Sequence, residues 1–121
     1  MVSGADDKRF TVAVRAVDGV VLLTLGGELD HDTAGPLKEA LDAAAHRGGR
    51  LLVDMAGLRF CDSTGLNALL HGRLAVQEAG GSLELAGLTG PVARMFRITG
   101  ADGVFPVHAD VTQALGANQG R

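Results

Sequence analysis

Two hydroxyl side chains, Ser63 and Thr64, follow an aspartate and precede a glycine in the stretch FCDSTGLNALL at residues 60–70. An apolar, strand-like run ends before this cluster, and an apolar run with helical spacing begins after it. A side-chain oxygen at a helix start can accept hydrogen bonds from the unpaired backbone N–H groups of the first turn. One such oxygen is enough for capping, so the consecutive polar residues indicate a further use for a hydroxyl.

Phosphorylation is the chemistry that suits a serine in this position. Backbone N–H groups and the helix dipole stabilise negative charge at a helix start, so we expect the helix to survive a phosphate on Ser63. The phosphate would add about 1.5 to 2 negative charges beside Asp62 and would repel a partner that docks there. The stretch therefore predicts a switched binding surface that needs no catalysis by the chain itself.

A second polar segment, GELDHDT at residues 27–33, precedes another run with helical spacing. If the strands that end before the two segments are parallel neighbours, both segments lie at one edge of the sheet, where open α/β sheets place their sites. Gly65 is expected at this surface because a glycine allows a partner's backbone to approach closely. The predicted docking surface consists of Asp30, His31, Asp62, Ser63, Thr64, Gly65 and Asn67.

Glycine pairs at residues 26–27, 48–49 and 80–81 divide the chain into the elements that must position these segments. Alternating apolar residues over 10–15 predict an edge strand, and Asp18-Gly19 favours a type I′ hairpin turn into the next strand. That next strand begins with an apolar run, and residues 51–53 form another. Continuous apolar runs are typical of central strands that are covered on both faces.

Apolar residues at helical spacing predict a first helix over 37–45, with Asp32 or Thr33 as its cap. A second helix starts within the opening stretch. Its predicted buried stripe consists of Leu66, Leu69, Leu70 and Leu74.

The part of the chain after the second helix predicts a strand at 82–86, a helix that ends before Gly100, a weak short strand at 104–107 and a final helix capped by Asp110. Successive strand-helix-strand units require a mostly parallel sheet. We therefore expect an α/β fold with a mostly parallel central sheet of about five strands, an antiparallel edge strand and about four helices. The expected domain spans residues 10–116, with a disordered tail at 1–9 and a flexible tail at 117–121.

Composition limits the possible functions. A chain of 121 residues with 46% hydrophobic content suits one compact domain. A net charge of -3 without Trp or Tyr offers neither a basic stripe nor a stacking platform, so we expect no nucleic-acid partner. The apolar runs are too short to span a membrane. A lone cysteine, Cys61, and an N-terminus without secretory features indicate the cytoplasm.

Residues 27–34 and 60–66 resemble the two signature loops of the anti-sigma factor antagonists, which belong to the STAS domain family. The resemblance spans nearly the whole chain, and it implies a partner switch. The unmodified antagonist would bind an anti-sigma factor that is also a serine kinase, and so would free a sigma factor. Phosphorylation of the serine after the aspartate, here Ser63, would reverse this, and a metal-dependent serine phosphatase would restore binding.

The resemblance also assigns roles to single positions. Asp30 matches a family position that is associated with partner contact. Thr64 stands where the family has either Ser or Thr, so it is a secondary phosphate acceptor or only a cap. Cys61 stands where many relatives have a larger apolar residue, and it is expected to pack under the loop.

Three alternatives remain beside the switch. The first is a STAS scaffold without switching, and the second is a module that binds a small ligand. The third is a hydrolase with Ser63 as nucleophile and a histidine base, for which the candidates are His31, His46, His71 and His108. A nucleophile elbow requires a glycine two residues before the serine, but Cys61 stands there.

Metal and nucleotide sites have weaker support in the sequence. Asp30-His31-Asp32 would point its side chains in opposite directions, and no second cluster has the spacing of metal ligands. No glycine pair is followed by the Gly-Lys-Ser/Thr of a phosphate-binding loop. We therefore expect neither a metal nor a cofactor.

Overall fold

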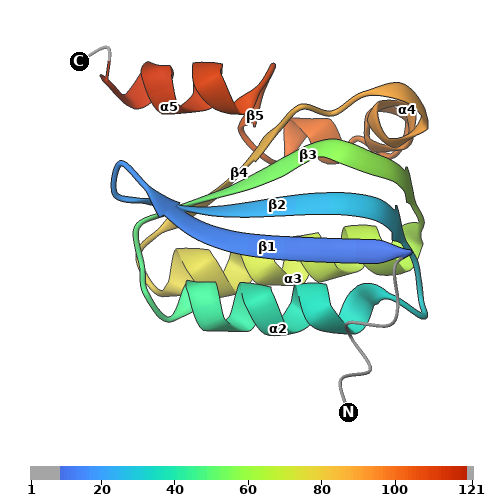
Figure 1. The fold of residues 1–121 in the computed structure, drawn as a ribbon, viewed down its shortest axis with the longest axis horizontal. Helices are drawn as coiled ribbons and strands as arrows, with labels where there is room; N and C mark the ends of the chain where they lie inside the picture. Colours follow the sequence, from blue (N-terminus) through green and yellow to red (C-terminus); the bar gives the residue numbers. More distant parts are fainter. Residues whose placement is uncertain (1–8, 120–121) are drawn as a thin grey trace.

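The structure is a computed structural model that describes residues 9–119, so the predicted tail positions 1–8 and 120–121 lie outside the described residues. Its strands form a single five-stranded sheet in the order β1-β2-β3-β4-β5 (Figure 1). The strands are β1 (Phe10–Val17), β2 (Val20–Leu29), β3 (Arg50–Cys61), β4 (Ser82–Ala86) and β5 (Val107–His108). The helices are α2 (Ala34–Ala45), α3 (Ser63–Glu78), α4 (Gly90–Thr99) and α5 (Val111–Gln119), with a short 3-10 turn at Ala101–Gly103.

The sheet has the mixed topology that the sequence predicts. β1 pairs with β2 in antiparallel orientation, and every other neighbouring pair is parallel. Asp18 and Gly19 have φ angles of 53° and 78°, as a type I′ turn requires. The expected α/β fold with an antiparallel edge strand is therefore confirmed.

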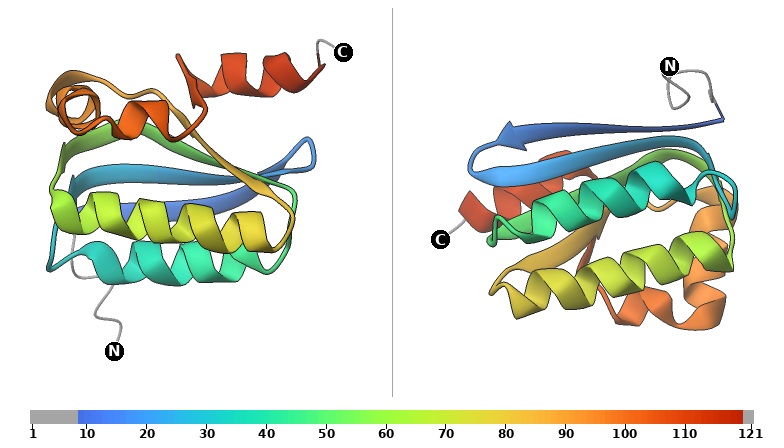
Figure 2. Two further views of the ribbon diagram at one scale, coloured as in Figure 1. Left: turned by 180° about the vertical axis from the view of Figure 1, so that it is seen from behind. Right: turned by 90° about the horizontal axis from the view of Figure 1, so that it is seen from below.

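Helices cover both faces of the sheet. α2 and α3 lie side by side on one face, and α5 lies over the opposite face (Figures 1 and 2). Leu23 and Val53 face the larger core cluster on the α2 and α3 side, whereas Leu22 and Leu52 join Ala114 of α5 in a smaller cluster. Successive strand residues point to opposite faces, so this two-sided cover explains the continuous apolar runs.

The predicted apolar stripe of α3 is partly wrong. Leu66 and Leu69 are buried, but Leu74 is 52% exposed. Small residues take the inward positions instead: Gly65, Ala68 and Gly72 are buried. A Cβ atom added at Gly72 would lie 3.0 Å from Cδ1 of Leu41, so α2 and α3 pack closely there and a larger side chain would require Leu41 to move. Helix contact, rather than hydropathy alone, sets the buried face.

The last strand is shorter than predicted. Residues 104–107 were expected to form it, yet the strand is Val107–His108. Val104 instead ends the 3-10 turn and donates its N–H to the Ala101 carbonyl at 2.9 Å. Pro106 has no N–H to donate, although its carbonyl accepts a hydrogen bond from Leu85.

The final helix begins where the sequence predicts. Asp110 Oδ1 accepts the N–H of Gln113 at 2.8 Å, which confirms the expected cap of α5. The helix continues past residue 116 to Gln119.

Candidate functional site

The two polar segments meet at the carboxyl ends of β2 and β3. Leu29 pairs with Cys61 at the last position of the parallel ladder. The N–H of Asp62 then donates to the Leu29 carbonyl at 3.1 Å, so the hydrogen bonding continues into the loops. The topology thus brings together segments that are far apart in the sequence, as the parallel pairing predicts.

Asp62 is the cap of α3. Its Oδ1 accepts the N–H of Thr64 at 2.9 Å and of Gly65 at 3.2 Å, and its carbonyl accepts the N–H of Leu66 at 3.0 Å. One carboxylate therefore accepts two of the unpaired N–H groups of the first turn. Neither hydroxyl that follows it is needed for capping.

Ser63 is the first residue of α3 and is exposed. Within residues 9–119 its hydroxyl has no hydrogen-bond partner, a histidine included. The half-buried Thr64 hydroxyl is likewise unbonded within the described range. The site therefore offers an exposed hydroxyl to another molecule, without the adjacent base that a nucleophile requires.

The loop before α2 is held by its own side chains. Thr33, which is buried, accepts the N–H of Asp30 at 2.9 Å, and its hydroxyl also lies 2.9 Å from the Glu28 carbonyl. Asp30 Oδ1 accepts the N–H groups of Asp32 and Thr33 at 2.9 and 3.1 Å. Asp30 is half-buried and His31 is exposed.

The predicted capping of α2 is wrong. Thr33 occupies the N-cap position, but its side chain makes no capping hydrogen bond. Its hydroxyl is used within the loop, and the Asp32 side chain makes no cap either. This local network fixes the loop beside Asp62, a role that the residue types alone do not distinguish from capping.

Gly65 has an internal reason for being glycine. It is buried, and a Cβ atom there would lie 2.6 Å from Cγ of Leu29 and 2.9 Å from Sγ of Cys61. The start of α3 can approach β2 and β3 only without that side chain. The structure thus gives Gly65 a packing role where the sequence suggested the approach of a partner's backbone.

Cys61 packs beneath the site. It is 6% exposed, and burial together with the neighbouring Asp62 carboxylate raises the pKa of its thiol to about 12. The thiol stays protonated at neutral pH and serves as a small apolar side chain, as expected.

Two exposed residues near the site were not among the predicted set. Phe60 is 46% exposed, and it points to the face of the sheet opposite Cys61 because strand side chains alternate. His71 lies on the same side of α3 as Ser63 and Asn67, at helical spacing, and lines a groove of about 260 Å³ between α2 and α3. In the sequence, the exposure of Phe60 could have been inferred from its position next to Cys61, which was expected to pack inward.

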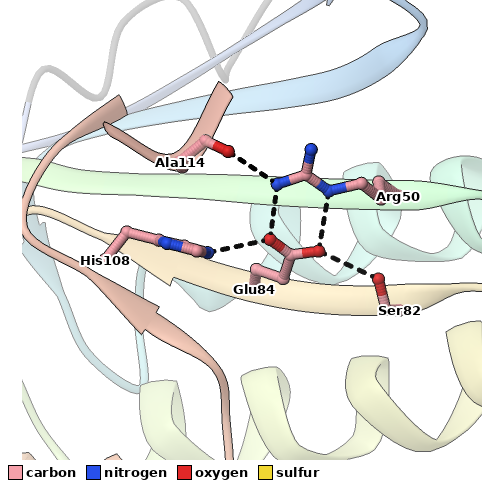
Figure 3. Close-up of polar contacts among 5 residues, drawn as sticks. All are labelled: Arg50, Ser82, Glu84, His108 and Ala114. Atoms are coloured by element: carbon pink, nitrogen blue, oxygen red, sulfur yellow. Dashed lines mark hydrogen bonds and ion pairs between the residues drawn. The ribbon is translucent and has the colours of Figure 1, made fainter. Parts of the chain in front are cut away.

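A second polar cluster lies at the opposite ends of β3 and β4 (Figure 3). Glu84 Oε2 accepts Nε of Arg50 at 2.8 Å, and Oε1 accepts Nη2 at 2.7 Å. Ser82 and His108 also contact this carboxylate, at 3.1 and 2.9 Å, and Arg50 Nη2 donates to the Ala114 carbonyl at 3.0 Å. The Arg50 guanidinium chiefly lowers the pKa of Glu84 to about 2.

This cluster joins β3, β4, β5 and α5. Arg50 and Ser82 begin their strands, whereas Ser63 follows the far end of β3, roughly 35 Å away along an extended strand. The cluster therefore stabilises the fold away from the site. His108, a candidate base in the hydrolase alternative, is part of it.

The described residues were also searched for metal-binding groups and for membrane-spanning helices. Across residues 9–119, no group of three or more His, Cys, Asp or Glu side chains is arranged to hold a metal ion. Every helix in the same range is too short or too polar to cross a membrane.

Comparison with known proteins identifies the family. The family described as "Mlab, STAS domain" matches residues 12–109. The chain belongs to the STAS domain family. An anti-sigma-B factor antagonist of Bacillus subtilis is 31% identical over 98 residues, which cover 81% of this chain and 90% of that protein.

Solved structures agree with this assignment. An anti-sigma factor antagonist from Mycobacterium paratuberculosis superposes with a TM-score of 0.80 at 29% identity, over 89% of this chain and 92% of that chain. The antagonist SpoIIAA has been solved in an unphosphorylated form, with a TM-score of 0.77 at 22% identity, over 92% of this STAS chain and 98% of that one. The phosphorylated form of SpoIIAA, a Bacillus cell fate determinant, superposes with a TM-score of 0.70 at 21% identity, over 88% of this chain and 98% of that chain. The last two likenesses concern the fold alone.

Proposed function

We propose that this STAS domain is an anti-sigma factor antagonist whose binding is controlled at Ser63. In the unphosphorylated state it binds an anti-sigma factor that is also a serine kinase, and this binding releases a sigma factor for transcription. The kinase then phosphorylates Ser63 and ends the binding, and a serine phosphatase reverses the modification. The observation that carries the proposal is an exposed serine, unbonded within the described residues, at the junction of two loops.

The proposed docking surface surrounds this serine. Its residues are Asp30, His31, Asp62, Ser63, Thr64, Gly65 and Asn67. Asp30 and Asp62 hold the two loops through their bonds to backbone N–H groups. Gly65 contributes indirectly, because it lets the start of α3 lie close to β2 and β3. His31, Ser63 and Asn67 are exposed for contact.

The capping geometry supports a switch by charge. Asp62 already accepts the N–H groups of Thr64 and Gly65, so these donors are not free to hold a phosphate on Ser63. The phosphate would stay at the surface beside a carboxylate and add about 1.5 to 2 negative charges. Repulsion and lost packing would then weaken binding without unfolding the helix.

In this proposal the chain is a regulator and a substrate, and catalysis belongs to the kinase and the phosphatase. No cofactor, metal, nucleic acid or membrane takes part on the antagonist's side. The exchange of partners takes place in the cytoplasm.

The proposal can be tested by affinity capture from native cell extract, with bound proteins identified by mass spectrometry. The baits are the wild type, Ser63→Ala and Ser63→Glu, and Thr112→Glu is a matched control that adds the same charge at an exposed position on α5. We expect a small ATP-binding serine kinase on the wild type, on Ser63→Ala and on Thr112→Glu, and its loss from Ser63→Glu.

Phosphate incorporation supplies the second readout. Incubation of the captured kinase with ATP should label the wild type and Thr64→Ala but not Ser63→Ala. Retention of the same proteins by all baits would instead favour a STAS scaffold without switching. Labelling that disappears in Thr64→Ala and persists in Ser63→Ala would move the acceptor to Thr64.

A further inference from the structure

The two edges of the sheet are protected very differently. β5 forms one edge with only two residues and follows Pro106, which has no N–H to offer. β1 forms the other edge with eight residues, FTVAVRAV, which include a single charged side chain, Arg15. Long, apolar edge strands template pairing with another strand unless charge, proline or a bulge protects them. Within residues 9–119 no strand pairs with the outer side of β1.

The hydrogen-bond pattern of the hairpin shows which groups of β1 face outward. The Arg9 carbonyl accepts the N–H of Glu28 at 2.6 Å, so Arg9 belongs to the set of residues that bond to β2. In an antiparallel ladder these residues alternate with others whose N–H and C=O groups point away from the partner strand. The outward-directed residues are therefore Phe10, Val12, Val14 and Ala16.

These outward groups define a register in which β1 pairs with itself. We propose that β1 is a dimerisation edge, on which the β1 strand of a second copy of this chain pairs in antiparallel orientation about a two-fold axis at Ala13. The hydrogen-bonded pairs are then Phe10 with Ala16 and Val12 with Val14, all of which are outward-directed residues. The result is one continuous sheet across both copies.

Side-chain size and charge fit this register. Ala13, a small and exposed residue, meets its own copy at the axis. Val14, which is 53% exposed, gains a cross-strand apolar contact with Val12. Arg15 lies opposite Thr11, so the charged side chains of the two strands are not placed against each other. This self-complementarity favours a second copy over an unrelated strand.

The dimer edge is separate from the proposed docking surface. Ser63 follows β3, and β2 lies between β3 and β1 in the sheet. Asp30 and His31 follow the end of β2, whereas Ala13, at the dimer axis, pairs with Thr24 in the middle of that strand. The inference therefore goes beyond the proposed function, and either can fail without the other.

Analytical ultracentrifugation of the full chain over a wide concentration range tests the proposal. We expect the wild type to show a monomer-dimer equilibrium. Ala13→Glu and Ala13→Lys should each weaken dimerisation by about tenfold or more, because each places like charges at the axis. An equimolar mixture of the two variants should restore the dimer. Ala43→Glu, at an exposed position of α2, is the matched control and should dimerise like the wild type.

Each contrary result overturns the proposal. A wild type that stays monomeric shows that β1 does not dimerise, and a dimer that persists in both Ala13 variants shows that it uses another surface. Failure of the mixture to restore the dimer excludes the register about Ala13. Circular dichroism and melting temperatures check folding, and Val14→Pro is an independent variant that removes one outward N–H and should abolish the dimer.

Discussion

The two ends of β3 carry polar sites of opposite character. At its start, Arg50 and Glu84 form a bidentate pair to which Ser82 and His108 add hydrogen bonds (Figure 3). Beyond its end, the Ser63 hydroxyl is exposed and has no hydrogen-bond partner within the described residues. Polar groups that satisfy one another hold the fold, whereas a polar group left unbonded at the surface is available to a partner.

The largest expected effect comes from breaking the pair of Arg50, which is half-buried, and Glu84, which is buried. Glu84→Gln should lower the free energy of unfolding by about 3 kcal/mol, because it leaves the Arg50 guanidinium without its counter-charge. Urea unfolding measures this loss, and Glu78→Gln, at an exposed position of α3, is the matched control with a change below about 0.5 kcal/mol. If Glu84→Gln and Glu78→Gln lowered the free energy of unfolding by similar amounts, the cluster around Glu84 would not have the stabilising role that distinguishes it from the site at Ser63.

The same pair should make stability depend on pH. Hydrogen bonding from Arg50 lowers the pKa of Glu84 from 4.5 to about 2, so the unfolded chain binds more protons than the folded chain between these values. The contribution of Glu84 is complete above its unfolded pKa and is lost as the pH falls from about 4.5 towards 2. Urea unfolding at several pH values should show this acid sensitivity reduced in Glu84→Gln, and equal slopes in both proteins would contradict it.

Crowding beneath the proposed docking surface should have the next largest effect. Gly65→Val places a Cβ atom 2.6 Å from Cγ of Leu29 and should cost about 1 to 3 kcal/mol of stability. Gly35→Ala is the matched control, since a Cβ atom at this exposed position of α2 meets nothing within 4 Å and should stabilise the helix by about 0.5 to 1 kcal/mol. Thermal melting of both variants checks the contrast. Wild-type stability in Gly65→Val would mean that the start of α3 shifts at little cost.

The smallest effects separate the cap, Asp62, from the proposed phosphate acceptor, Ser63. Asp62→Ala removes the oxygen that accepts two N–H groups and should cost about 1 kcal/mol. Ser63→Ala should change stability by less than about 0.5 kcal/mol, because its hydroxyl is exposed and unbonded within the described part of the chain. Chemical denaturation of the two variants measures the difference. A larger loss in Ser63→Ala would return the serine to a capping role.

Sequence periodicity and turn chemistry predicted most of the fold. Asp18-Gly19 specified the hairpin, and the apolar runs specified strands covered on both faces. The prediction that Leu74 is buried was wrong because a hydropathy pattern does not show how closely two helices approach. The predicted position of the short last strand was wrong because Pro106 and the 3-10 turn before it compete with strand pairing.

The site was only partly accessible to the same reasoning. The parallel topology brought Asp30 near Asp62, but it did not show which polar side chain caps which helix. That depends on local hydrogen bonds, in which Thr33 bonds within its loop and Asp62 caps α3 alone. The cluster around Glu84 joins residues from four elements, so no local sequence pattern predicts it.

The order of the strands has a consequence for how the protein is made. Each strand from β2 to β5 pairs with the strand that precedes it in the chain, so each new strand can dock on a neighbour that has already been synthesised. β2 and β3 are complete at Cys61, and α3 follows at once. The surface around Ser63 can therefore assemble during translation before β4, α4 and α5 leave the ribosome. The later elements then complete a sheet whose two polar loops, at Asp30 and Asp62, are already in place.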